Sequence, residues 1–85
     1  MIPLMELKRK AKGLKPTVQI GKYGLTDEVL KEINKQLKDK KLIKIRLQRA
    51  FVLGKSRKEI AKEIANKTNA RIVSIVGNTI SLFKE

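Results

Sequence analysis

The chain has 85 residues, enough for a single domain over residues 1–85 with one hydrophobic core. It contains 21 Lys and Arg against 8 Asp and Glu, a formal net charge of +13, and neither Cys nor His, which excludes disulfides, thiolate metal sites and the commonest general base. No apolar run approaches the roughly 20 residues of a membrane span, and no secretory leader is evident, so we expect a cytoplasmic protein.

A helix is predicted over residues 3–12. Its apolar positions recur at the spacing of one helix face: Leu4, Leu7, Ala11 and Leu14. Its basic side chains fall mostly outside that face: Lys8, Arg9, Lys10 and Lys12. Gly13 and Pro16 should end the helix. For each of these cations, a solvated surface position and a contact with nucleic acid are both open.

A short strand over residues 17–20 and a glycine-bracketed turn follow. Val18 and Ile20 share one strand face, and the turn is Gly21-Lys22-Tyr23-Gly24. Thr26 is a favourable N-cap for the next helix, over residues 27–39. The backbone N–H groups at that helix start and the lysine ammonium suit a phosphate group, although a plain connecting turn is the alternative.

The clearest strand is predicted over Leu42–Arg49. Its residues alternate between apolar and polar, with Ile43, Ile45 and Leu47 against Lys44, Arg46 and Gln48. One face should be buried, while Lys44 and Arg46 lie on the other, about 7 Å apart. These two cations belong to a strongly basic block, but a solvated strand face also explains them.

The chain between this strand and the next helix fits no regular pattern. Gly54-Lys55-Ser56 resembles the end of a P-loop, but Arg49 stands where that motif needs glycine. Ser56 and Glu59 form a capping box that opens a third helix. Polar and β-branched residues close this helix at Asn66–Asn69.

A β-hairpin is predicted at the end of the chain. Strands over residues 71–76 and 79–83 flank Gly77-Asn78, which is typical of a type II′ turn, and Val73 and Ile75 are predicted to share one face. The order α-β-α-β-α-β-β therefore predicts an α/β (α+β) fold with a mixed four-stranded sheet, whose strand order this pattern does not give.

The chemistry of the side chains favours binding over catalysis. No nucleophile is placed with an adjacent base, so we expect no enzyme activity, catalytic residue, cofactor, metal or small-molecule substrate. Residues 1–22 carry six basic and one acidic side chain, and residues 38–58 carry nine and one, which is typical of a polyanion-binding protein. Of the three aromatic residues, only Tyr23 is placed to stack on one base, and a ring folded over its own loop is the alternative. Recognition should then rest mainly on backbone phosphates and shape.

Together these motifs resemble the CRM domain, in particular the YhbY-type family of stand-alone RNA-binding proteins, over about residues 4–84. The stretches that carry the resemblance are Leu14-Lys15-Pro16, Ile20-Gly21-Lys22-Tyr23-Gly24-Leu25-Thr26, Leu42-Ile43-Lys44 and Ile75-Val76-Gly77-Asn78-Thr79-Ile80-Ser81-Leu82-Phe83-Lys84. The ending differs slightly, because Phe83-Lys84 stands where the family often has Tyr-Arg, which removes a hydroxyl and a bidentate guanidinium.

The resemblance implies a fold related to the C-terminal domain of bacterial translation initiation factor three. It implies binding of precursor large-subunit ribosomal RNA in prokaryotes, assistance to large-subunit assembly, and a relation to plant organelle proteins that assist group II intron splicing. By position, the RNA-binding residues are then the loop Gly21, Lys22, Tyr23 and Gly24 and the cations Lys8, Arg9, Lys12, Lys15, Lys44, Arg46 and Arg49. We expect a monomer.

Three other classes remain open. A small basic chromatin protein of the Alba type has a similar topology and charge, and would dimerise and bind DNA or RNA without sequence preference. A structural ribosomal protein would be present stoichiometrically in mature subunits. A membrane-surface protein would bind anionic vesicles but not RNA, although no membrane partner is expected here.

Overall fold

The computed structural model describes residues 2–85. Its elements are α1 (Leu4–Lys12), β1 (Val18–Ile20), α2 (Asp27–Lys40), β2 (Leu42–Leu47), α3 (Arg49–Val52), α4 (Arg57–Thr68), β3 (Arg71–Val76) and β4 (Thr79–Phe83). The predicted α+β order is confirmed, with one short helix, α3, added between the second strand and the third long helix. None of the helices in the described part of the chain is long and apolar enough to cross a membrane.

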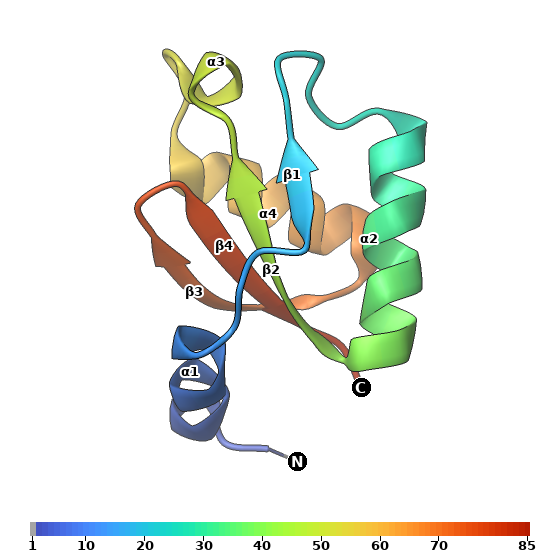
Figure 1. Ribbon diagram of the computed structural model, residues 1–85, viewed down its shortest axis with the longest axis vertical. Helices are drawn as coiled ribbons and strands as arrows, with labels where there is room; N and C mark the ends of the chain where they lie inside the picture. The colour runs from blue at the N-terminus through green and yellow to red at the C-terminus, as the bar shows by residue number, and fades with distance from the viewer. Residues whose placement is uncertain (1) are drawn as a thin grey trace.

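The four strands form one mixed sheet in the order β1-β2-β4-β3. Strand β1 runs parallel to β2, and β4 runs antiparallel to both β2 and β3. Strands β2 and β3 therefore point the same way, joined by a crossover through α4. The mixed four-stranded sheet predicted from the sequence is confirmed, and the structure supplies its strand order (Figure 1).

The main core lies between one face of the sheet and the helices α2 and α4. Alternation in β1 and β2 turns every second side chain inward. The helices contribute apolar stripes at helical spacing. The fully buried members from these elements are Ile20, Ile33, Leu37, Ile43, Ile45, Leu47, Ala61 and Ile64. The other face of the sheet carries Lys44 and Arg46 of β2.

Helix α1 covers only part of that other face. Leu7 and Ala11 pack with Val73 and Phe83 in a second, small buried cluster. Leu4 and Leu14 were predicted on the same apolar face, but both remain 36% exposed because the helix rests on the sheet through its middle turns only. The open part of the sheet lies between α1 and the loop after β1 (Figure 1).

The predicted shared face of Val73 and Ile75 is wrong. The register of β3 against β4 shifts between Ile72 and Ser74, which is a β-bulge. Since a bulge inserts one residue into the alternation, Val73 joins the cluster under α1 whereas Ile75 packs against the main core.

The predicted end of the second strand at Arg49 is also wrong. Strand β2 stops at Leu47, and Arg49 begins α3. Phe51 and Val52 turn inward from this short helix and join the main core. Their burial explains why the chain bends here rather than continuing the strand.

Local signals fix the remaining boundaries. The Thr26 hydroxyl accepts a hydrogen bond from the Val29 N–H at 3.2 Å, and the Ser56 hydroxyl accepts from the Glu59 N–H at 3.4 Å, so both predicted N-caps are confirmed. Gly77 has a positive φ and Asn78 does not, which fits the predicted type II′ turn. The described N-terminal end and the C-terminus lie at one end of the long axis, and the loop after β1 lies at the other (Figure 1).

Candidate nucleic-acid interface

The loop of residues 21–24 is a hydrogen-bonded turn at the tip of the molecule. The Gly24 N–H donates to the Gly21 carbonyl at 2.9 Å, and the Thr26 N–H donates to the Gly24 carbonyl at 3.0 Å. The backbone N–H groups of Lys22, Tyr23 and Leu25 have no acceptor among residues 2–85. Three unpaired donors at one exposed turn are a suitable environment for an anion.

The loop packs on α3 through its two glycines. A Cβ placed on Gly21 would lie 3.1 Å from Oε1 of Gln48, and one on Gly24 would lie 3.1 Å from Cε1 of Phe51. The Phe51 side chain is almost fully buried. The ammonium of Lys55 lies 4.4 Å from the centre of the Phe51 ring. Helix α3, which the sequence did not predict, is therefore the support of the loop.

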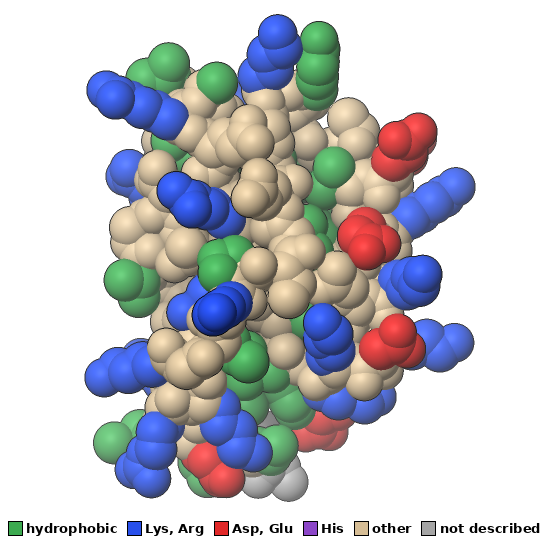
Figure 2. Space-filling model, viewed as in Figure 1, with side chains coloured by type: hydrophobic (Ala, Val, Ile, Leu, Met, Phe, Trp, Pro, Cys, Tyr) green, Lys and Arg blue, Asp and Glu red, His purple; other side chains and the backbone are tan. Residues whose placement is uncertain are grey.

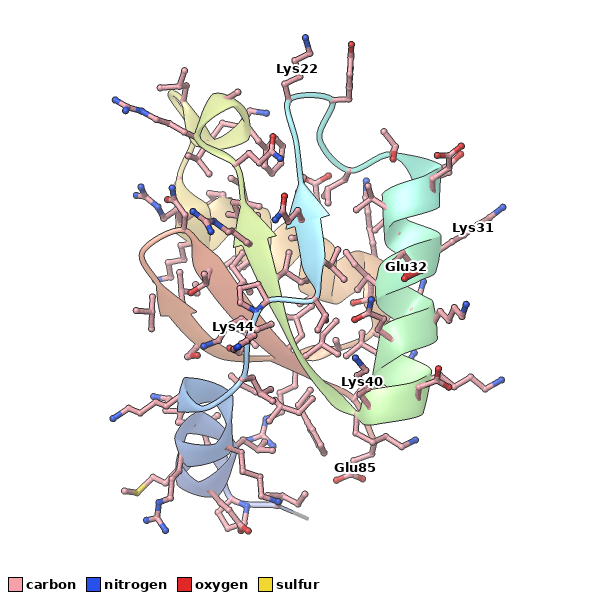
Figure 3. All side chains as sticks on the ribbon, in the orientation of Figure 1. Lys22, Lys31, Glu32, Lys40, Lys44 and Glu85 are labelled. Atoms are coloured by element: carbon pink, nitrogen blue, oxygen red, sulfur yellow. The ribbon has the colours of Figure 1, made fainter. Side chains whose placement is uncertain are left out.

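Lys22 and Tyr23 form the exposed tip of the loop. The Tyr23 side chain is 82% exposed, so its ring does not fold back over the loop. The Lys22 ammonium lies 5.2 Å from the centre of that ring, and Figure 3 shows Lys22 pointing away from the rest of the molecule. An ammonium and an aromatic face side by side match a phosphate and an adjacent base.

Three predicted cations meet in one groove between α1 and the open face of the sheet. Lys8 and Lys12 come from α1 and Lys44 from β2, and together with Ser74 and Thr79 they line a groove of about 480 Å³. Lys44 stands on the sheet face between α1 and the loop (Figure 3). The docking of α1 across the sheet is what brings these side chains together.

The other predicted cations lie outside this groove. Arg46 and Arg49 line a second pocket at the ends of β1 and β2. Arg9 and Lys15 are exposed but line neither of these two sites. The structure therefore brings Lys8, Lys12 and Lys44 together, and Arg46 with Arg49, but does not place Arg9 or Lys15 with either group.

Basic side chains outnumber acidic ones on the face of the molecule that Figure 2 shows. Within residues 2–85, two ion pairs form, Glu6–Lys10 and Glu63–Lys67, so most of the 21 basic side chains have no acidic partner. In Figure 2 several acidic side chains lie along one edge, over α2, where they alternate with lysines, and others lie at the bottom of the view, near α1 and the C-terminus. Over the sheet and the loop this view shows only Lys and Arg as charged groups.

Two features of the surface were not predicted from the sequence. A groove of about 860 Å³ runs from the loop along α4, between Tyr23, Phe51 and Lys67. The pocket of the two arginines is also lined by Gln19, Gln48 and Asn78. The alternation in β1 indicates only that Gln19 lies on the outward face of the sheet, because it stands between the inward residues Val18 and Ile20.

The last residues of the chain act inside the protein. Phe83 is buried beneath α1, and the Lys84 ammonium donates to the Thr68 carbonyl at 3.0 Å, at the end of α4. A cation at a helix C-terminus is favourable. The aromatic-basic ending thus docks one helix and caps another.

The fold and the site together define a small four-stranded α+β domain with a partly open, basic sheet face and a glycine-bracketed loop. The chain belongs to the CRS1/YhbY (CRM) domain family, whose model matches residues 4–84. The resemblance predicted from the sequence is therefore confirmed.

Two proteins are similar to this chain in sequence. The "Probable RNA-binding protein MJ0652" of Methanocaldococcus jannaschii is 41% identical over 78 residues, which are 92% of this chain and 58% of that protein. The "Probable RNA-binding protein YqeI" of Bacillus subtilis is 33% identical over 79 residues, 93% of this chain and 80% of that protein. The chain thus spans little more than half of the archaeal relative.

A solved structure has the same fold. The solution structure of the hypothetical protein SAV1595 from Staphylococcus aureus superposes with a TM-score of 0.81 and 26% sequence identity. The similarity covers 100% of this chain and 90% of that one. The expected α+β architecture is therefore shared along the whole chain.

Proposed function

We propose that this protein binds RNA, and that its target is precursor ribosomal RNA during assembly of the large ribosomal subunit. The observation that carries the proposal is a set of basic side chains without an ion-pair partner within residues 2–85, which lie on α1, on the open sheet face and at the tip of the loop. A basic surface of this kind fits the phosphate backbone of a nucleic acid. The names of the two relatives support RNA as the nucleic acid.

The parts of this surface have different roles in the proposal. Lys22 and the unpaired N–H groups of the loop hold phosphates, as a helix start or a backbone concavity does for other anions. Tyr23 stacks on one base. The cations of α1 and β2 attract the phosphates of the neighbouring RNA backbone.

The test is crosslinking of the protein to nucleic acid in its own cells, with ribosomal particles separated on a gradient. We expect crosslinks to ribosomal RNA in immature large-subunit particles, through the peptide that contains Lys22 and Tyr23. A Lys22→Gln variant should lose most of them, whereas Lys31→Gln on α2 should not, although each removes one charge.

Two outcomes would contradict the proposal in different ways. Crosslinks scattered over genomic DNA, with none in ribosomal fractions, would favour a chromatin protein. Equal amounts of the protein in all mature large subunits would indicate a structural ribosomal component instead of an assembly factor.

A further inference from the structure

A small polar pocket lies at the carboxyl ends of β1 and β2, beside α3. It has a volume of about 300 Å³ and is lined by Gln19, Arg46, Leu47, Gln48, Arg49 and Asn78. Gln19 and Arg46 are register partners on the neighbouring strands. Asn78 comes from the β3–β4 turn, which is fixed here because the Leu47 N–H donates to the Asn78 carbonyl at 2.7 Å.

The pocket adjoins the loop that is proposed to hold phosphates. The Gln48 N–H donates to the Ile20 carbonyl at 2.9 Å, directly before the loop. The Gln48 side chain also lies against Gly21, close enough that an added Cβ would be 3.1 Å from its Oε1. The pocket and the loop are therefore adjacent on the surface.

Internal hydrogen bonds orient the amides of the pocket. Nε2 of Gln48 donates to Oε1 of Gln19 at 3.3 Å, and Nε of Arg57 donates to Oδ1 of Asn78 at 2.6 Å. The Gln19 and Asn78 NH₂ groups are left as donors, and Gln48 Oε1 is left as an acceptor. The guanidinium groups of Arg46 and Arg49 make no ion pair within residues 2–85.

We propose that this pocket binds one guanine base of single-stranded RNA. Guanine presents two acceptors, O6 and N7, on one edge, and an arginine paired to them is the commonest specific contact to a base. Adenine presents a donor beside N7 on that edge, which a pocket rich in donors disfavours. Gln48 Oε1 accepts no hydrogen bond within residues 2–85 and can receive an N–H of guanine.

The neutral amides indicate that the ligand of the pocket is a base and not a phosphate. Two arginines alone would also bind a phosphate. Amide side chains from three segments add little to phosphate affinity, but they pair with the edges of unstacked bases. This inference rests on the proposed RNA binding and adds to it the class of base that is recognised.

The test uses fluorescence anisotropy with ten-nucleotide RNAs at one fixed salt concentration. The probes are a uridine run and the same run with a central guanine, adenine or 7-deazaguanine. We expect the guanine probe to bind roughly 5- to 100-fold more tightly than the adenine probe. The 7-deazaguanine probe should lose most of that gain, because it lacks the N7 acceptor.

Variants locate the effect in the pocket. Gln19 and Gln48 are exposed, so the double substitution Gln19→Ala with Gln48→Ala should leave the fold intact. It should remove the preference for guanine, measured in the same variant as the ratio of its affinities for the guanine probe and the adenine probe. Asn34→Ala, an exposed amide on α2, is the matched control and should keep the preference.

Each result is decisive. Equal, salt-dependent binding of all four probes would overturn guanine recognition and leave the RNA-binding proposal intact, with the arginines acting on phosphates. A preference that survives in the double variant would overturn the assignment to this pocket. Absence of binding to every probe would contradict both proposals.

Discussion

Gly24 combines two constraints at a single residue. Its φ of +75° lies in the left-handed region that favours glycine, and the space beside its Cα is occupied by the Phe51 ring. Gly54 has a similar φ of +72°, but nothing lies within 4 Å of the position of its Cβ. The two glycines therefore share the conformational requirement but not the packing requirement.

Substitution by alanine separates these requirements. Gly54→Ala should lower the free energy of unfolding by about 1 kcal/mol, the cost of a left-handed residue with a Cβ. Gly24→Ala should lower it by about 2–4 kcal/mol, because the loop must also shift away from Phe51. Urea denaturation of both variants measures the difference, and equal losses would show that the loop does not depend on its contact with α3.

The role of a residue could be predicted from the sequence when it depends on residues a few positions away. The caps Thr26 and Ser56 were predicted correctly because each acts on a backbone N–H three residues away. Gln19, Gln48 and Asn78 were not predicted as one site, because they come from three segments. Their proximity follows from the strand order, which the pattern of residues does not contain.

At the scale of elements, α1 packs on the sheet in a small cluster separate from the main core. It has nine residues and contacts the sheet mainly through Leu7 and Ala11. A helix of this length is not stable by itself in water. Its structure, and with it the groove of Lys8 and Lys12, therefore depends on docking.

The substitution Leu7→Ala should weaken that docking by about 2–5 kcal/mol, because it leaves a cavity among Ala11, Val73 and Phe83. Amide hydrogen exchange should then become fast throughout α1 while β2 and β4 stay protected. Met5→Ala, on the exposed side of the same helix, is the control and should change little. Uniform loss of protection in all elements would show that α1 is instead part of the cooperative core.

The long elements were predictable and the short irregular ones were not. Helices α2 and α4 and strand β2 each contain enough residues to show their period, so their boundaries were predicted within about two residues. Helix α3 has four residues, fewer than are needed to show a helical period. The bulge in β3 adds one residue to an alternating pattern, and this addition reversed the predicted face of Val73.

At the scale of the whole molecule, the two basic blocks of the sequence become one surface. The blocks are separated along the chain by the acidic stretch that includes much of α2. Parallel pairing of β1 with β2 and the docking of α1 bring them to the same side. The charge pattern predicted a polyanion partner, but the continuity of the surface required the fold.

Salt dependence tests this surface. If about six phosphates are neutralised, the logarithm of the binding constant should fall with the logarithm of salt concentration at a slope of roughly −4 to −5. Lys44→Gln with Arg46→Gln should reduce the magnitude of that slope by roughly 1.5. Lys31→Gln with Lys35→Gln on α2 removes the same charge and should leave the slope unchanged, so an equal effect of both pairs would refute a localised interface.

The described N-terminal end and the C-terminus both lie away from the loop, and this placement has a practical consequence (Figure 1). A fluorophore, an affinity handle or a surface tether attached at either end is held along the long axis away from Lys22 and Tyr23. A handle at the C-terminus therefore leaves the loop accessible to RNA, whereas one at the N-terminal end would lie beside the cations of α1, which are part of the proposed interface.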